Sequence, residues 1–124
     1  MSRTYELFHG SPADGILSIM NAGSMRPDPF GQIFYSERFE DALQHGADRK
    51  RGASFAFKAE VTVPNDAVVE RTATQGNPVA VIFKTKLPLP TKVLELYVRL
   101  GRVGQFELKT IKGAGAIKAY LLKT

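Results

Sequence analysis

The amino-acid sequence predicts an α+β fold in one domain, because helical patterns lie in the first part of the chain and strand patterns follow. With 124 residues, 44% of them hydrophobic, the chain is long enough for one core and too short for two ordinary domains. Between residues 53 and 63, apolar and polar side chains alternate with a period of two, as in a half-buried strand. We therefore expect a single domain over residues 1–124 with a mainly antiparallel sheet.

The N-terminal part is predicted to form a strand and then a short helix. The strand is expected at Tyr5–Phe8. Ser11 and Pro12 have the chemistry of a helix N-cap and a first helical residue. Ile16, Ile19 and Met20 then recur at helical spacing until Gly23 supplies a stop, so a helix is predicted over residues 12–22.

A loop, a short strand and a second helix are expected next. Two prolines and a glycine within Ser24–Gln32 predict a loop, which leads to a strand at Ile33–Tyr35. Apolar residues then recur at helical spacing from 39 to 47, and the cations at 49–51 suit the end of a helix dipole. We therefore expect the second helix to begin after Ser36 and to end near those cations.

Strands are expected in the remainder of the chain. Residues Pro64–Pro78 show little periodicity and are predicted as a long loop. The glycines at 113 and 115 allow a turn, so the last two strands are predicted to form a hairpin. The predicted strands are Ala53–Val63, Val79–Lys86, Thr91–Leu100, Gln105–Lys112 and Ala116–Lys123.

Composition restricts the classes of partner. Seventeen Lys and Arg against twelve Asp and Glu give a net charge of +5, which favours RNA, dinucleotides or acidic proteins. The chain has no cysteine and only two histidines, without an acidic cluster beside them, so no metal site is expected. No apolar run reaches the roughly 20 residues of a membrane-spanning helix, and the N-terminus lacks the pattern of a secretory signal. We expect no membrane partner.

The first segment with chemical potential is His9-Gly10-Ser11, at the junction of the first strand and the first helix. A glycine there lets a flat ligand approach the backbone, and the histidine and serine offer side-chain hydrogen bonds. Considered alone, a histidine at such a position is more often structural.

Two further segments carry aromatic and acidic side chains. Because strand side chains alternate, we expect Phe34 to pack in the core and Tyr35 to face a cleft, where it would stack on a charged ring such as nicotinamide. Gln105 and Glu107 are expected on one face of their strand, and a carboxylate there can stabilise an oxocarbenium-like charge. Considered alone, these residues are also typical of core packing and of a solvated face.

Taken in order, the three segments resemble the ADP-ribosyltransferase family, in its His-Tyr-Glu branch that includes diphtheria toxin and the poly(ADP-ribose) polymerases. That branch has a His-Gly-Ser/Thr motif before a helix, a tyrosine in a Phe-Tyr-Ser-like strand, and a glutamate at the start of a late strand. The matching residues are His9-Gly10-Ser11, Phe34-Tyr35-Ser36 and Glu107. The resemblance covers nearly the whole chain and implies a split antiparallel sheet with two short N-terminal helices.

The resemblance implies a role for each matched residue. His9, Tyr35 and Glu107 would be the catalytic residues, with His9 on the ribose of NAD, Tyr35 stacked on nicotinamide and Glu107 as the catalytic carboxylate. Gly10 would bind the nicotinamide amide through its backbone, and Gln105 would contact the acceptor.

Other residues complete the implied NAD site. Ser11 belongs to the first motif, and His45 occupies the neighbourhood where the family has a second stacking tyrosine. Arg26 would reach the pyrophosphate. An alignment to the polymerase branch instead shifts the family tyrosine onto Phe34.

The implied activity is mono-ADP-ribosyl transfer, with NAD as substrate, no metal, and release of nicotinamide. The small size implies an interbacterial toxin domain, delivered as part of a larger secreted protein, acting in the target-cell cytoplasm and neutralised by a cognate immunity protein. Cations at 49–51, 84–92 and 99–112 favour RNA slightly over protein as the macromolecular acceptor.

Other functions remain open at this point. A basic nucleic-acid- or protein-binding module without catalysis would bind in a salt-sensitive way and ignore NAD. An NAD glycohydrolase would release free ADP-ribose without labelling an acceptor. An RNA 2′-phosphotransferase would need further histidine and arginine residues, which are not evident. The transferase requires His9, Tyr35 and Glu107 to converge on one cleft.

Overall fold

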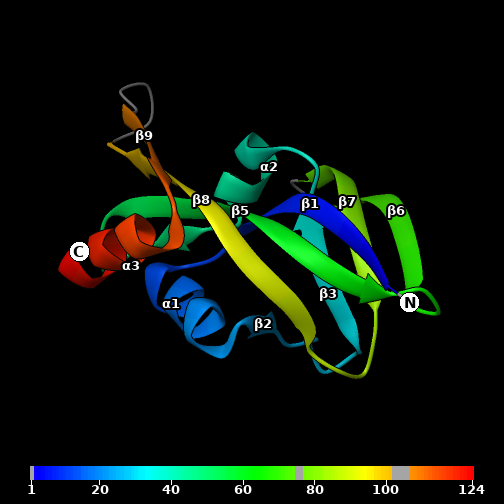
Figure 1. The fold of residues 1–124 in the computed structure, drawn as a ribbon. Helices are drawn as coiled ribbons and strands as arrows, with labels where there is room; N and C mark the ends of the chain where they lie inside the picture. The colour runs from blue at the N-terminus through cyan, green and yellow to red at the C-terminus, as the bar shows by residue number, and fades with distance from the viewer. Residues whose placement is uncertain (1, 75–76, 102–106) are drawn as a thin grey trace.

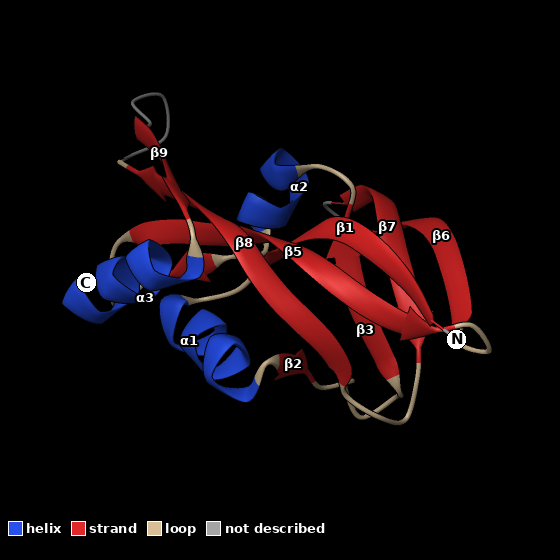
Figure 2. Cartoon of the chain, viewed as in Figure 1, coloured by secondary structure: helices blue, strands red, loops and turns tan. Residues whose placement is uncertain are grey.

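The computed structural model describes residues 2–74, 77–101 and 107–124. In these ranges the chain forms a nine-stranded sheet, in which every strand pair is antiparallel, together with three helices (Figures 1 and 2). The predicted α+β class with a mainly antiparallel sheet is therefore confirmed. The helices are α1 (Ala13–Ala22), α2 (Phe39–Gln44) and α3 (Ala114–Lys123).

The sheet is divided between two neighbouring strands, β1 and β3, which pair over a very short length. The strand order is β2-β8-β5-β1-β3-β7-β6, with β4 paired to β5 and β9 paired to β8. β1 pairs with β5 over nine positions, but within the described residues it pairs with β3 only where Phe8 lies opposite Ser36. The two halves of the sheet therefore diverge next to the end of β1. The strands are β1 (Ser2–Gly10), β2 (Ser24–Met25), β3 (Gln32–Ser36), β4 (Ala47–Asp48), β5 (Ala53–Pro64), β6 (Val68–Thr74), β7 (Asn77–Lys84), β8 (Leu89–Leu100) and β9 (Glu107–Lys112).

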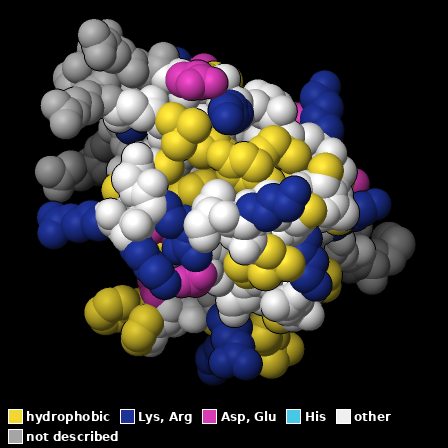
Figure 3. Space-filling model, turned by 90° about the vertical axis from the view of Figure 1, so that its left-hand side faces the viewer, with side chains coloured by type: hydrophobic (Ala, Val, Ile, Leu, Met, Phe, Trp, Pro, Cys, Tyr) yellow, Lys and Arg dark blue, Asp and Glu magenta, His cyan; other side chains and the backbone are white. Residues whose placement is uncertain are grey.

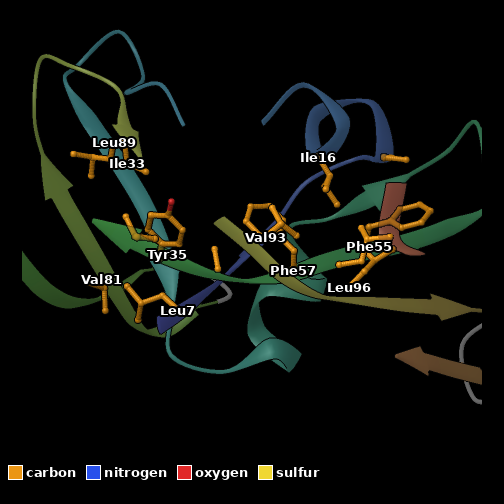
Figure 4. Packing of buried hydrophobic residues seen from close by; sticks show 14 of the residues in the cluster. Leu7, Ile16, Ile33, Tyr35, Phe55, Phe57, Val81, Leu89, Val93 and Leu96 are labelled. Atoms are coloured by element: carbon orange, nitrogen blue, oxygen red, sulfur yellow. The ribbon is translucent and has the colours of Figure 1, made fainter. Parts of the chain in front are cut away.

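Apolar clusters lie on both faces of the sheet. The larger cluster contains Phe55 and Phe57 of β5 and packs against α1 and α3 (Figure 4). Ala56 points to the opposite face, as strand alternation requires, and belongs to a smaller cluster beneath α2. In Figure 1, α1 and α3 lie side by side below the sheet and α2 lies above it. The central strands are therefore covered on both faces.

The start of α1 depends on a residue distant in sequence. The prediction that Ser11 caps the helix was wrong, because Pro12 occupies the N-cap position and the helix begins at Ala13. The Ser11 hydroxyl instead donates to the Pro12 carbonyl at 3.2 Å. The backbone N–H of Ala13 donates to Oδ2 of Asp48 at 3.0 Å. A carboxylate from the short strand β4 thus satisfies the first helical N–H.

The prediction of a C-terminal hairpin was wrong. Residues 114–123 form α3, in which Ile117 and Leu121 are fully buried and Tyr120 packs against the same core. These three positions have the i, i+3, i+4 spacing of one helical face. Gly113, with φ of 90°, marks the change from β9 to this helix.

Two other predicted boundaries also differ. The expected loop over 64–78 contains strand β6, which forms the edge of the sheet beside β7. The second helix ends at Gln44 rather than near the cations at 49–51. The chain must pass close to β5 at Gly46, where an added Cβ would lie 1.7 Å from the carbonyl oxygen of Phe55. This close approach ends α2 early.

Candidate functional site

A pocket of about 210 Å³ opens where β1 and β3 diverge. It lies at the C-terminal end of β1, beside the end of α2. Its walls are formed by β1, by β3 and by the residue that follows α2. The described lining residues are Phe8, His9 and Gly10 of β1, Phe34, Tyr35 and Ser36 of β3, and His45 directly after α2.

His9 is held in one tautomer. Its Nδ1 lies 2.7 Å from the carbonyl oxygen of Phe34. Because a carbonyl oxygen only accepts, Nδ1 carries the proton and Nε2 of the neutral ring is an acceptor. Burial, helped by the charge of His45, lowers the pKa of His9 to about 4. The hydrogen bond with Phe34 raises this pKa but does not outweigh burial. The ring is therefore neutral near pH 7.

Aromatic neighbours fix the plane of the His9 ring. The rings of Tyr35 and Phe57 both have their centroids 5.6 Å from it, Tyr35 in an edge-on arrangement. Such tilted contacts are the favourable geometry for aromatic pairs. The imidazole is thus positioned by β3 and β5 together.

The expected orientation of Phe34 and Tyr35 was wrong. Tyr35 is 1% exposed and packs in the larger core cluster, whereas Phe34 is 36% exposed at the pocket. The Tyr35 hydroxyl donates to the sulfur of Met25 at 3.3 Å. Burial raises its pKa to about 12, although a hydrogen bond with Thr91 opposes this. Tyr35 therefore has no open ring face for stacking, and the exposed aromatic ring is Phe34.

Gly10 turns its backbone toward the gap in the sheet. The N–H of Ser11 donates to the Phe55 carbonyl, so Ser11 faces β5 and Gly10, one residue earlier, faces the β3 side. Within the described residues β3 offers Gly10 no backbone partner there, since the strands pair only at Phe8. The residue must be glycine, because a Cβ would lie 1.8 Å from the Ala42 carbonyl oxygen of α2. Gly10 thus presents an N–H and a C=O at the pocket.

The remaining predicted NAD-site residues are placed differently from one another. His45 is exposed and lines the pocket, and its N–H donates to the Ala42 carbonyl at 3.0 Å. Ser11 and Arg26 are outside the set of described lining residues; Ser11 is occupied with Pro12, and Arg26 is exposed after β2. The structure therefore brings His9, Gly10, Tyr35 and His45 together.

Glu107 is exposed at the start of β9 and is not brought to this pocket. From β1 to β9 the order is β1, β5, β8, β9, which is roughly 14 Å across the sheet at a strand spacing of about 4.8 Å. Ile111 is the β9 residue level with His9, and Glu107 lies four residues before it, roughly 13 Å farther along the strand. Gln105, predicted to contact the acceptor, lies outside the described residues.

The pocket suits a flat group that donates hydrogen bonds. It is lined by His9, whose Nε2 is an acceptor, by Gly10 and by Phe34, and its described lining includes no carboxylate. Sequence reasoning assigned no role to Phe8, which adjoins His9, and Ser36 entered only as part of the Phe34-Tyr35-Ser36 match, without a role of its own. Within the described ranges, no group of three or more His, Asp and Glu side chains could hold a metal ion, and no helix is long and apolar enough to span a membrane.

Comparison with protein-family models, with curated proteins and with solved structures found no match to this chain.

Proposed function

We propose that this protein binds the nicotinamide end of NAD in the pocket between β1 and β3, and that any transfer of ADP-ribose to a macromolecule uses a carboxylate from outside the described lining of that pocket. The observation that carries the proposal is the pairing of a neutral His9 acceptor with an open Gly10 backbone in one pocket. These are the two positions to which the family resemblance assigns NAD contacts.

The proposed contacts follow from donor and acceptor chemistry. The carboxamide of nicotinamide both donates and accepts, which matches the C=O and N–H of Gly10. A ribose hydroxyl donates to Nε2 of His9, and the exposed ring of Phe34 contacts the positively charged nicotinamide. A volume of about 210 Å³ holds this end of NAD, and the rest of the dinucleotide extends outside the pocket.

The proposed transfer breaks the bond between the ribose carbon and the nicotinamide nitrogen. Nicotinamide leaves as a neutral molecule with the bonding electrons, and a nucleophile of the acceptor bonds to the ribose carbon and releases its proton. A carboxylate that stabilises the oxocarbenium-like charge accelerates this step. The resemblance assigns this role to Glu107, but the order of the strands places Glu107 away from the pocket. The convergence that a transferase requires is therefore not seen among the described residues, and binding and transfer need separate tests.

Binding is tested by calorimetric titration of NAD into the wild type and His9→Asn. The asparagine amide can still donate to the Phe34 carbonyl, but the variant lacks an acceptor at the Nε2 position. We expect NAD affinity to fall by about tenfold, the value of one hydrogen bond. Lys92→Gln, an exposed change on β8, is the control and should bind normally. Equal affinity in all three proteins would contradict the proposed pocket.

Transfer is tested by incubating labelled NAD and a cell lysate with the wild type, His9→Asn and Glu107→Gln. Label in the protein and RNA fractions is measured separately, together with free nicotinamide. Label transfer by the wild type that is lost in Glu107→Gln, with NAD binding retained, would show that Glu107 acts at the pocket despite its place at the start of β9. Free ADP-ribose without labelled acceptor would identify a glycohydrolase instead. Absence of both transfer and nicotinamide release would leave a binding module.

A further inference from the structure

Ion pairs neutralise many of the cations on this protein. Each pair joins a Lys or Arg to a carboxylate on the same or a neighbouring element, at 2.6 to 3.5 Å between charged atoms. Described pairs are Arg38 with Glu40, Arg51 with Asp14 and Asp48, Lys58 with Glu6, Arg71 with Glu37, and Lys84 with Glu70.

Six exposed cations at one end of the molecule form no ion pair among the described residues. The ladder places Leu100, at the end of β8, opposite both Ala53 of β5 and Glu107 of β9, and α3 follows β9 after one residue. Figure 3 views this end, where Lys and Arg side chains lie around and between apolar ones. The six, here called the basic end, are Arg49, Lys50, Lys109, Lys112, Lys118 and Lys123.

Most of the net charge of the chain is located here. With Arg51 and Arg99 included, this part of the described structure holds eight cations. It holds four acidic side chains, of which two bind Arg51 and a third, Glu95, lies opposite Lys112 in the ladder and accepts the Tyr97 hydroxyl. Eight cations less four acidic side chains leave an excess of four positive charges, against a net charge of +5 for the whole chain. The cations at 84–92 do not contribute, because they lie at or before the opposite end of the long strand β8.

The cations are distributed over a long surface and on both faces of β9. Ile111 packs in the core on the α3 side, so Lys109, two residues earlier, faces that side and Lys112 faces the other. β9 extends roughly 20 Å and α3 roughly 15 Å. Lysines at such spacing match a linear series of charges rather than a single anion.

We propose that the basic end binds double-stranded nucleic acid through its phosphates alone. Lysine contacts phosphate as a point charge, and phosphate contacts carry no sequence information. Among the described residues at this end, Phe55 is buried and Tyr120 is half-buried, whereas the exposed rings Phe30 and Phe34 lie elsewhere, so no fully exposed ring is described there on which single-stranded bases would stack. This inference concerns binding and does not depend on NAD chemistry.

The test measures fluorescence anisotropy of a labelled RNA duplex of roughly 20 base pairs, longer than the ~16 that known duplex-binding modules span. Lys109→Gln/Lys112→Gln is compared with Lys86→Gln/Lys92→Gln, which removes the same charge from exposed positions at the other end. We expect at least fivefold weaker binding for the first variant and less than twofold change for the second. The slope of log affinity against log salt should decrease by about 2 in the first variant only.

Three controls define the outcome. Thermal unfolding checks that both variants fold like the wild type. A DNA duplex of the same sequence should bind within about threefold of RNA, because only phosphates are contacted. The inference would be overturned if the two variants lost equal duplex affinity, or if the wild type did not bind the duplex at low salt. It would also be overturned if polyglutamate at matched charge competed as well as an unlabelled duplex. Glu107→Gln should retain duplex binding whatever its effect on transfer.

Discussion

Oδ2 of Asp48 accepts a hydrogen bond from the backbone N–H of Ala13 and also forms an ion pair with Arg51. One buried carboxylate therefore joins β4 to the start of α1. Burial acts to raise the pKa of Asp48, but the Ala13 hydrogen bond and Arg51 outweigh it and hold the pKa below its usual range. Because the pKa of Asp48 is lower in the folded than in the unfolded protein, the Asp48 carboxylate stabilises the fold above the unfolded pKa. This stabilisation is lost as the pH falls below about 4.

We expect Asp48→Asn to lower the free energy of unfolding by about 1 to 3 kcal/mol at pH 7, since it removes charge-assisted bonds from a buried site. Asp14→Asn, on the exposed partner of the same arginine, should cost less than about 1 kcal/mol. Urea unfolding of both variants provides the measurement. Equal effects would show that the exposed ion pair, and not the α1 contact, stabilises the junction.

The neutral state of His9 predicts a second acid-sensitive transition. Its folded pKa of about 4 lies below the ordinary histidine value of 6.5, so its contribution to stability is complete above pH 6.5 and is lost as the pH falls toward 4. We expect stability to fall by about 1 to 3 kcal/mol over this window, and His9→Asn to remove that part of the pH dependence. Urea unfolding between pH 7 and 4 measures it. A histidine-independent pH profile would mean that His9 titrates normally in the folded state.

Glycine substitutions distinguish close packing from open space. Gly46→Ala places a Cβ 1.7 Å from a backbone oxygen of β5, so we expect a loss of several kcal/mol or failure to fold. Gly115→Ala lies in α3 with nothing near its added Cβ and should stabilise the protein by up to about 1 kcal/mol. Thermal unfolding compares the two. Tolerance of alanine at both sites would contradict the close approach of the α2–β5 connection.

Phe34 and Tyr35 should separate binding from stability. Tyr35→Phe removes a buried hydroxyl with partners, so we expect it to destabilise the fold by about 1 kcal/mol and to leave NAD affinity unchanged. Phe34→Ala should weaken NAD binding severalfold with little change in stability, because its ring is exposed at the pocket. Unfolding and calorimetric titration of both variants test this. The reverse pattern would restore Tyr35 as the stacking residue.

The sequence predicted best where one local pattern was strong. The alternation at 53–63 identified β5, and helical spacing with a glycine stop located α1. α3 was mistaken for a strand because two glycines suggested a turn, although Ile117 and Leu121 already had helical spacing. β6, an exposed edge strand, buries too few side chains to produce a clear period.

The candidate site was predictable only in part for a related reason. The placement of His9 and Gly10 at a strand end followed from local sequence, and the pocket is located there. Alternation established that Phe34 and Tyr35 face opposite ways, but which face is core depends on α1, α3 and the distant strand β7. The position of Glu107 depends on the order of β5, β8 and β9 in the sheet, which no local pattern specifies.

The single Phe8–Ser36 pairing between β1 and β3 has a consequence for how this molecule can move. Two sheet halves joined at one backbone position can change their mutual angle at little cost in hydrogen bonds, whereas each half is stiff within its own ladders. A ligand seated in the gap touches both halves, so its binding would narrow the range of angles. Slower amide hydrogen exchange around Phe8 and Ser36 upon ligand addition would record that restriction without any catalytic readout.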